Sequence, residues 1–324
     1  MAPKQEILCS EVILEKYGRS LEGKTILITG VSDESIAGEL AILLSSANPA
    51  QLILSARAES RAATVIDKIK AANPQVAVRF LQMDLSSLAD IRKAVATLDD
   101  VPKLDSFVAC AGVMMPPYNV TADGVESQFA VNYLSNFLLV KLLLPKIEAA
   151  EPSSSILIVA SSAVRQGQVF FDDINFSDGK TYNPLTAYGQ SNAARVMFAK
   201  SLAEKLRDRK IRVFSIDPGA VRSGLQRHFP PELRASVDSM RESNTPLTDL
   251  DGRQYYLPPW TSRSEGAASI VTGMIDPTVE DSSGAFLHNN AVADDELHSH
   301  ILNRENWTKL WQLSEQFIGE DFTL

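Results

Sequence analysis

The sequence contains little cysteine and no excess of positive charge. Its two cysteines, Cys9 and Cys110, lie far apart among 324 residues, so neither a disulfide framework nor a cysteine-based zinc site is indicated. The formal net charge of −9 argues against a nucleic-acid partner or an anionic membrane surface. The composition is otherwise that of an ordinary globular chain, with 45% hydrophobic and 22% charged residues.

Several other patterns are also missing. Residues 1–23 carry acids among their apolar positions and no apolar core long enough for a signal peptide, and no stretch reaches transmembrane length. The absence of a G-x-S-x-G motif disfavours a serine hydrolase. His298 and His300 are two residues apart, a poor spacing for a helical metal site, so no metal is expected. The expectation is a cytoplasmic enzyme or binding protein.

What is present is a regular alternation. From Lys24 onward, short β-branched runs alternate with longer amphipathic runs, which is typical of a parallel sheet with crossover helices. We therefore predict one α/β domain over residues 24–324, a doubly wound parallel sheet of Rossmann type with helices on both faces, after an N-terminal extension over 1–23. Strands are predicted at 24–29, 51–56, 76–83, 104–109, 155–160, 212–216 and 285–288. Helices are predicted at 36–46, 87–98, 125–148, 185–209, 263–274 and 305–318. A further helix is predicted to follow the second strand and to end at residue 70.

Two segments interrupt this alternation. Pro145 falls inside the predicted helix over 125–148 and is expected to end or bend it. Residues 220–262 are rich in Pro, Ser and aromatic residues, and we predict a long irregular insertion there. Ligands of doubly wound sheets bind at the carboxyl ends of the strands, so this insertion is predicted to be a substrate lid.

The most informative stretch is residues 188–192, in the helix predicted over 185–209. Tyr188 and Asn192 are four residues apart and so share one face of that helix. A phenol there can exchange a proton with a substrate oxygen. Its ordinary pKa is about 10, so it ionises near neutral pH only beside a positive charge. The residue four positions on is a neutral asparagine.

The loop after the first predicted strand has the small and polar character of a phosphate-binding turn, in which backbone N–H groups and a helix N-terminus cradle a pyrophosphate. Asp33 and Glu34 bring negative charge to that loop, and a simple capped turn is the alternative interpretation. The residues predicted to contact the cofactor here are Gly30, Ser32, Ser35 and Ile36.

Residues after the next three strands extend this predicted site. Arg57 stands where an arginine suits the 2′-phosphate of NADP, unless it is simply solvated. Asp84, followed by Leu85, can meet an adenine amino group or cap a helix. The triplet Cys110, Ala111 and Gly112 lets a cofactor pass close by, and we expect Cys110 to be an inert small residue.

Two further positions are candidates for chemistry. Asn132 is a polar residue on an otherwise apolar helix, and could hold a water or the backbone near the tyrosine. Ser161 and Ser162 follow the fifth predicted strand, where a hydroxyl can steady a substrate carbonyl or alcohol beside the phenol. The alternatives are a satisfied helix amide and an ordinary turn.

In this order and at these spacings, the sequence resembles the short-chain dehydrogenase/reductase family, in a retinol-dehydrogenase-like branch, over about Lys24–Leu313. The resemblance rests on FVACAGVM, DGVESQFAVNYLSNFLL, VASSAVRQGQVFFDDINF…YNPLTAYGQSN and IDPGAVRSGL. It implies Tyr188 as general acid/base, Ser162 as its partner on the substrate oxygen and Asn132 as a proton-relay residue. It also implies that the nicotinamide packs near Pro218, Gly219, Val221 and Ser223.

The sequence departs from the family pattern at four places. The family's active-site lysine, which lowers the pKa of the phenol and binds the nicotinamide ribose, corresponds to Asn192, which could still reach the ribose without bringing a charge. The asparagine of the family's N-A-G corresponds to Cys110, and two glycines of its phosphate loop correspond to Ser35 and Ala37. The two acids of that loop replace neutral residues. All four departures predict weaker redox chemistry, and an engineered substitution at Asn192 is left open.

Three functions follow. The first is an NADP(H)-dependent oxidoreductase, in the reductase direction, acting on a bulky apolar carbonyl or alcohol of secondary metabolism. The second is a non-redox isomerase, cyclase or dehydratase that uses Tyr188 as acid, and the third is a catalytically silent relative. The resemblance implies a homodimer through the Tyr188 helix unless the C-terminal tail covers it. Predicted pocket walls are Val113, Met114, Met115, Pro116, Phe170, Phe171, Tyr255, Tyr256, Leu257 and Trp260.

Overall fold

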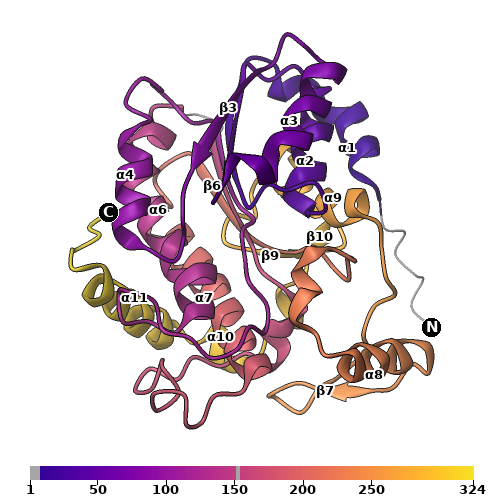
Figure 1. Ribbon diagram of the computed structural model, residues 1–324, viewed down its shortest axis with the longest axis vertical. Coiled ribbons are helices and arrows are strands. Elements are labelled where there is room, and N and C mark those ends of the chain that lie inside the picture. Colours follow the sequence, from indigo (N-terminus) through magenta and orange to yellow (C-terminus); the bar gives the residue numbers. More distant parts are fainter. Residues whose placement is uncertain (1–7, 151–153) are drawn as a thin grey trace.

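A computed structural model describes residues 8–150 and 154–324 (Figure 1). Its centre is an eight-stranded sheet in the order β10-β9-β6-β5-β4-β1-β2-β3, parallel except between β9 and β10. The strand order reverses between β1 and β4, which confirms the predicted doubly wound α/β fold. The strands are β1 Thr25–Thr29, β2 Gln51–Ala56, β3 Ala77–Gln82, β4 Ser106–Ala109, β5 Ser154–Val159, β6 Ile211–Asp217, β9 Phe286–His288 and β10 Ala291–Val292.

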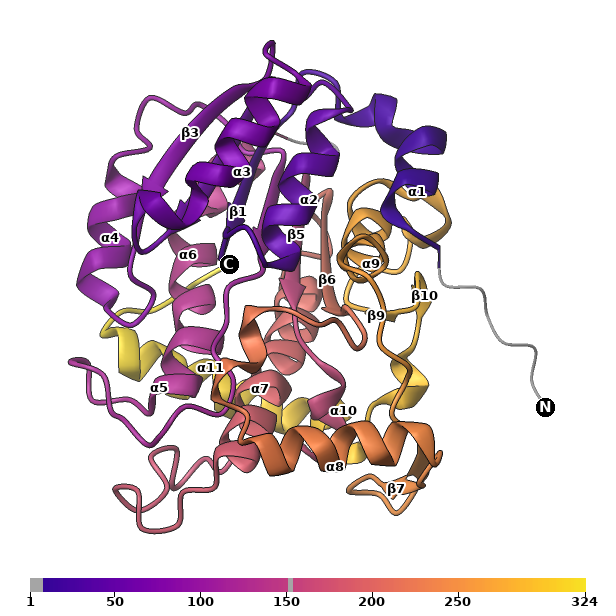
Figure 2. The same cartoon turned by 45° about the vertical axis from the view of Figure 1, so that its right-hand side comes forward.

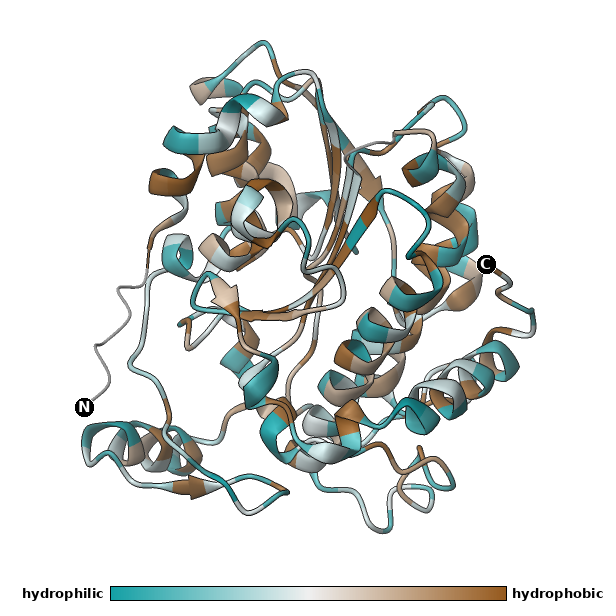
Figure 3. Cartoon of the chain, turned by 180° about the vertical axis from the view of Figure 1, so that it is seen from behind, coloured by the Kyte–Doolittle hydropathy of each residue, from teal (hydrophilic) through white to brown (hydrophobic). Residues whose placement is uncertain are grey.

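Helices cover both faces of this sheet. Successive strand residues point to opposite faces, so Ile26 and Ile28 pack in one hydrophobic cluster and Leu27 in the other. The central strands are accordingly hydrophobic along their length (Figure 3). The helices on the face of Ile26 and Ile28 are α1 Ser10–Tyr17, α2 Ile36–Ser45, α3 Glu59–Ala72 and α9 Arg263–Ile275; those on the other are α4 Leu88–Ala96, α6 Ser135–Glu148, α7 Pro184–Lys205 and α11 Arg304–Ile318.

The helix after β4 differs from its prediction in two ways. It runs without a break from α5 (Ser127–Phe129) through a π-helical turn, Ala130–Leu134, into α6. Pro145 lies inside α6 and does not end it, since the helix continues for three more residues to Glu148. By length and composition Ser127–Glu148 could cross a membrane, contrary to our expectation for the sequence, but 72% of its apolar window is buried inside the fold. Such burial is what the core helix of a folded domain shows.

The insertion is more regular than predicted. It contains α8 (Pro231–Glu242) and a hairpin of β7 (Leu247–Thr248) and β8 (Gln254–Tyr255), which lie together at one end of the molecule (Figure 2). No residue of α8 is buried, although Leu233, Val237 and Met240 form a short apolar stripe at helical spacing. The prediction of an irregular chain was wrong at this point.

Both ends of the chain pack on the sheet domain. The N-terminal extension, whose residues 1–7 lie outside the described part, forms α1, and α1 packs against α9. At the other end, α11 packs along α7, where the Trp311 ring lies 5.9 Å from that of Phe198. The C-terminal tail therefore covers the helix that the sequence left open as a dimer interface.

Candidate active site

A cavity of about 740 Å³ opens at the carboxyl ends of the central strands. This volume is within the ordinary range for small-molecule sites. The loops that follow β1 to β6 line it on the sheet side, and residues of α8, β7 and β8 line it on the side of the insertion. The cavity thus lies where doubly wound sheets bind ligands, and the predicted lid borders it.

Tyr188 lines this cavity from the second turn of α7. Asn183 begins the helix, its side-chain oxygen accepting the N–H groups of Leu185 and Thr186, and Pro184 occupies the first helical position. The Tyr188 side chain is only 6% exposed. Burial raises its pKa, while a hydrogen bond with Ser161 and the positive charge of a neighbouring arginine act to lower it. The phenol is therefore protonated at neutral pH and suited to donate a proton.

The hydroxyl that bonds to the phenol belongs to Ser161, one residue before the predicted Ser162. Ser161 is still extended and begins a 3-10 turn, where its Oγ accepts the N–H of Ala163. The carboxylate of Asp217, at the end of β6, accepts the backbone N–H of Gly219 at 3.0 Å. Both serines line the cavity, so Ser161 and the predicted Ser162 are both candidate partners of Tyr188, and Ser161 acts to lower the pKa of its phenol.

Asn192 does not line the cavity. It is fully buried, its amide donates to the carbonyl of Tyr188 at 2.9 Å, and its side-chain oxygen accepts a long contact of 3.4 Å from Arg195. Asn192 was expected to reach the nicotinamide ribose, but its side chain lies away from the cavity in which a cofactor would bind. The residue that does line the cavity, one turn further along α7, is Arg195.

Asn132 lies in the π-helical turn and is also fully buried. Its side chain exchanges two hydrogen bonds with the backbone of Val113, at 2.8 and 2.9 Å, and donates to Ser191 at 2.9 Å. Its own carbonyl accepts from Arg195. Asn132 thus ties the loop after β4 to α7, and the carbonyl that it presents already has a cationic donor. π-Helical turns of this kind are frequent at functional sites.

The loop after β1 passes very close to the end of β4. Gly30 has a φ of +82°, and a Cβ atom there would lie 2.6 Å from the Cα of Ala111. Ser35 caps α2, since its hydroxyl accepts the N–H groups of Ser32 and Gly38. The serine at this position, which replaces a glycine of the family pattern, is accommodated without left-handed backbone.

The two acids of this loop turn away from the cavity. Asp33 forms an ion pair with Lys68, and its carbonyl accepts from Arg263 at 2.9 Å. Neither Asp33 nor Glu34 lines the cavity. The negative charge predicted to oppose a phosphate is therefore directed outward.

The comparisons with known proteins identify the family. A family model described as enoyl-(acyl carrier protein) reductase matches residues 30–251. Retinol dehydrogenase 14 of Mus musculus is 31% identical over 315 residues, which cover 92% of this chain and 87% of that protein. The chain belongs to the short-chain dehydrogenase/reductase family. Within that family it resembles the retinol-dehydrogenase-like branch, as its sequence predicted.

Two further relatives agree with this assignment. Oxidoreductase calI of Penicillium decumbens is 30% identical over 328 residues, which cover 94% of this chain and 90% of that protein. The structure of a short chain dehydrogenase from Salmonella enterica superposes with a TM-score of 0.60 at 19% identity, over 90% of this chain and 100% of that one. At that identity the superposition shows the shared fold alone.

Short-chain dehydrogenases/reductases bind a nicotinamide dinucleotide, and one end of the cavity has the character of a phosphate site. Arg57, Arg61 and Arg227 all line it there, and none of them pairs with a carboxylate among the described residues. Burial, and after it the charges of Arg61 and Arg57, lower the pKa of Arg227. Three neighbouring cations without a counter-ion fit a phosphorylated cofactor. The sequence predicted only the first of them.

The middle of this short-chain dehydrogenase cavity is lined by the predicted residues after β3 and β4. Asp84 and Leu85 line it, and one oxygen of Asp84 accepts both the backbone N–H and the hydroxyl of Ser86. Cys110 also lines the cavity, and burial raises its thiol pKa to about 12, so it is a neutral, unreactive group as expected. Ala111 and Gly112 complete this wall.

The predicted nicotinamide segment, which follows β6, also borders the cavity. Gly219 takes a φ of +73° directly after β6, and Ser223 caps a 3-10 turn in a reciprocal bond with Gln226. The backbone therefore turns sharply over the cavity mouth. The predicted residues that line it here are Pro218, Gly219, Val221 and Ser223.

Half of the predicted pocket walls line the cavity. Val113, Met114, Tyr255, Leu257 and Trp260 do. The other five do not: the Phe170 ring packs against that of Phe176 at 5.9 Å, for example, and Tyr256 is 52% exposed. The sequence missed Leu233, Val237 and Met240 of α8, because their apolar stripe is short and stands among prolines and serines.

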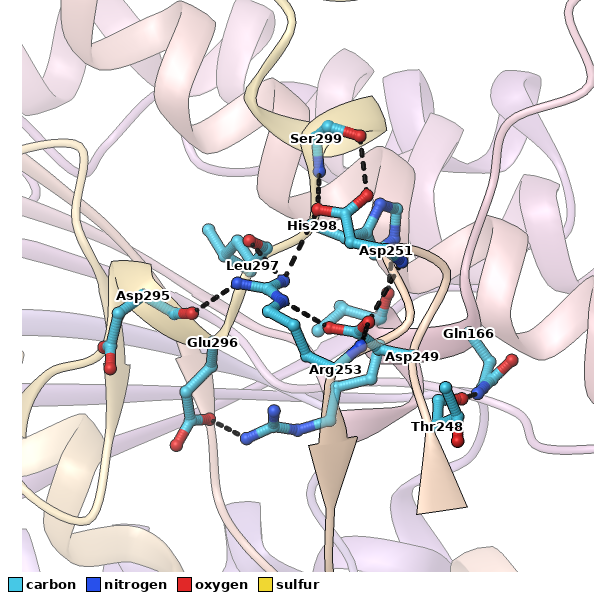
Figure 4. Close-up of polar contacts among 12 residues, drawn as sticks. Gln166, Thr248, Asp249, Asp251, Arg253, Asp295, Glu296, Leu297, His298 and Ser299 are labelled. Atoms are coloured by element: carbon cyan, nitrogen blue, oxygen red, sulfur yellow. Dashed lines mark hydrogen bonds and ion pairs between the residues drawn. The ribbon is translucent and has the colours of Figure 1, made fainter.

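The hairpin of the insertion is anchored to the C-terminal segment (Figure 4). Arg253 binds the Asp249 carboxylate and the carbonyls of Asp295 and Leu297, each at 2.8 Å. His298 donates from its ring Nε2 to the carbonyl of Gly167 at 2.8 Å, and so holds the turn after β5. These contacts fix one side of the insertion, while α8 makes none of them.

Proposed function

We propose that this protein is an NADP(H)-dependent short-chain reductase that acts on a bulky, apolar carbonyl compound. The observation that carries the proposal is the layout of one cavity. The three arginines, which have no carboxylate partner in the described part of the chain, follow β2 or come from the insertion, whereas the buried phenol lies near Ser161 after β5, three strands away in the sheet. A dinucleotide phosphate at the arginines would leave its reactive ring beside the phenol.

The chain's own residues account for the proton. Tyr188 is held protonated by its burial and donates its proton to the carbonyl oxygen of the substrate, while the Ser161 hydroxyl steadies the same oxygen. A bound nicotinamide supplies the hydride. The raised pKa of Tyr188 favours this direction, because reduction needs the phenol as a donor. The same acid would serve a non-redox reaction, which the experiment below separates.

The wall opposite the tyrosine supports an apolar substrate. Val113, Met114, Leu233, Val237 and Met240 present aliphatic surface to the cavity. The relative named retinol dehydrogenase is, by its name, active on an apolar alcohol. We propose that residues 220–262 act as the lid of a single domain spanning 24–324, and that α8 is its moving part because the hairpin is anchored.

Turnover with the full chain tests the proposal. NADPH oxidation is followed with a panel of apolar aldehydes and ketones, retinal included. We expect turnover that falls roughly 10²- to 10⁴-fold in Tyr188→Phe, and that is unchanged in Tyr118→Phe, whose ring lies outside the cavity. Absence of NADPH binding by fluorescence would overturn the proposal. A substrate isomerised without NADPH oxidation would establish the non-redox alternative. The cytoplasmic location expected from the sequence stays a prediction for cell fractionation.

A further inference from the structure

Arg195 occupies a special position relative to Tyr188. It lies seven residues further along α7, which is two turns, so both side chains project from the same face. Long side chains on a helix point back toward its N-terminus, which for Arg195 is the direction of Tyr188. Arg195 is only 4% exposed, yet its guanidinium reaches the cavity wall.

The guanidinium is held entirely by neutral acceptors. Its Nε donates to the carbonyl of Asn132, one Nη donates to the carbonyl of Ala111, and the other contacts the Asn192 side-chain oxygen at 3.4 Å. No carboxylate lies within ion-pair distance of it in the described part of the chain. Placing an unpaired charge in a buried site is costly, whereas a neutral amide could donate similar bonds at lower cost. The retained charge therefore calls for a role.

We propose that Arg195 supplies the positive charge that stabilises ionised Tyr188, taking over from the lysine that short-chain dehydrogenases carry at position 192. This inference rests on the proposed function, in which Tyr188 exchanges the proton. Arg195 acts through Tyr188 and is a positioning residue. Its contacts to the carbonyls of Asn132 and Ala111 fix the guanidinium in place, and Asn192 forms a neutral spacer between it and the tyrosine backbone.

The charged and titratable groups around the phenol are few. Burial raises the pKa of Tyr188 most, the Arg195 charge from α7 lowers it, and Asp217 at the end of β6 raises it. Burial lowers the pKa of Arg195 to about 10, so the guanidinium stays charged at neutral pH. Cys110, which faces Arg195 from the end of β4, is a neutral thiol and does not compensate it. Removal of Arg195 would leave Asp217 as the nearest charge.

The test measures the phenol itself, without cofactor or substrate. 3,5-Difluorotyrosine is incorporated at position 188, since its phenol is more acidic than that of tyrosine and titrates while the protein is folded. Its fluorine resonance is followed against pH in the full chain. We expect Arg195→Gln to move the titration upward by about one unit or more, the size of effect that a nearby opposite charge has. Arg195→Lys should keep it within about half a unit, since the charge is retained.

Two variants serve as controls. Lys205→Gln removes the same charge from the exposed end of α7 and should leave the titration unchanged. Asn192→Lys/Arg195→Gln moves the charge back by one turn and should restore the original midpoint. If Arg195→Gln does not fold, this double variant and Arg195→Lys decide, because both retain a charge. An upward displacement of a unit or more in either one would overturn the proposal.

An unchanged titration in folded Arg195→Gln would also overturn it and leave Arg195 as a tie between α7 and β4. Because the measurement needs no turnover, its result is independent of the proposed function. If NADPH is never consumed but the titration moves as expected, the charge assignment holds and the reaction assignment fails.

Discussion

The arginines at one end of the cavity predict how the enzyme chooses its cofactor. Arg57 and Arg61 come from the segment after β2 and Arg227 from the insertion, and all three are exposed. A hydrogen bond to a charged group contributes about 1.5–3 kcal/mol, and 1.4 kcal/mol corresponds to a tenfold change in affinity. Solvent screening places exposed arginines at the low end of that range. We expect Arg57→Gln to weaken NADPH binding about tenfold and NADH binding less than about twofold.

The assay is titration of cofactor fluorescence at low and moderate salt. Arg207→Gln is the matched control, since Arg207 is 70% exposed, lies outside the cavity and carries the same charge. Arg227→Gln should also weaken NADPH selectively, and combining it with Arg57→Gln should be less than additive, because both would bind one phosphate. Equal weakening of NADH and NADPH in Arg57→Gln would refute the reasoning, and so would the same loss in Arg207→Gln.

Two other side chains carry predictions. Arg253→Ala should release the hairpin from the C-terminal segment, raising KM more than it lowers kcat and lowering the free energy of unfolding by about 1 kcal/mol, because the side chain is half exposed; unchanged proteolysis within residues 220–262 would contradict this. For His288, burial lowers the pKa, but the bond to Glu296 and the neighbouring carboxylates raise it overall. Its contribution to stability should therefore be complete below about pH 6.5 and be lost as the pH rises through the raised value. In urea denaturation, His288→Gln should therefore be less stable than the natural sequence at low pH and equally stable at high pH. An equal loss of stability at all pH values would contradict this.

The fold could be predicted because each core strand is a short apolar run. β2 (Gln51–Ala56) matched its prediction at both ends, and it is buried from Leu52 onward. α8 was missed because its apolar stripe is short, stands among prolines and serines, and faces a cavity rather than a core. α1 was missed because Ser10–Tyr17 is short and buries only three residues. Periodicity therefore identified the elements that make the core and missed those that border the site.

The predicted cofactor-binding residues lie at the cavity where the backbone fixes their places. Gly30, Gly112 and Gly219 line the cavity as expected, since the close approach of strands and the sharp turn after β6 dictate their places. Ser162 stays a prediction beside Ser161, because both serines line the cavity and only the local turn decides which hydroxyl faces the phenol. The order of strands cannot decide between two adjacent serines.

Arg195 was missed because only the fourth residue after the tyrosine was considered, although the seventh lies on the same helix face. A charged side chain can approach Tyr188 from position 192, one helical turn away, or from position 195, where a longer side chain reaches back over two turns. Restoring the family's lysine by Asn192→Lys alone would place an ammonium near the Arg195 guanidinium, which already contacts the Asn192 side chain at 3.4 Å.

Two like charges about 4 Å apart cost roughly 4 kcal/mol at the effective dielectric constant of about 20 that suits protein sites. Asn192→Lys should therefore lower the free energy of unfolding by a few kcal/mol, on the order of that repulsion, rather than improve activity. Asn192→Lys/Arg195→Gln should recover most of the loss, since only one cation remains. The comparison of the two variants in urea is decisive. If Asn192→Lys is as stable as the natural sequence, the site has room for both charges, and Arg195 does not stand in for a lysine.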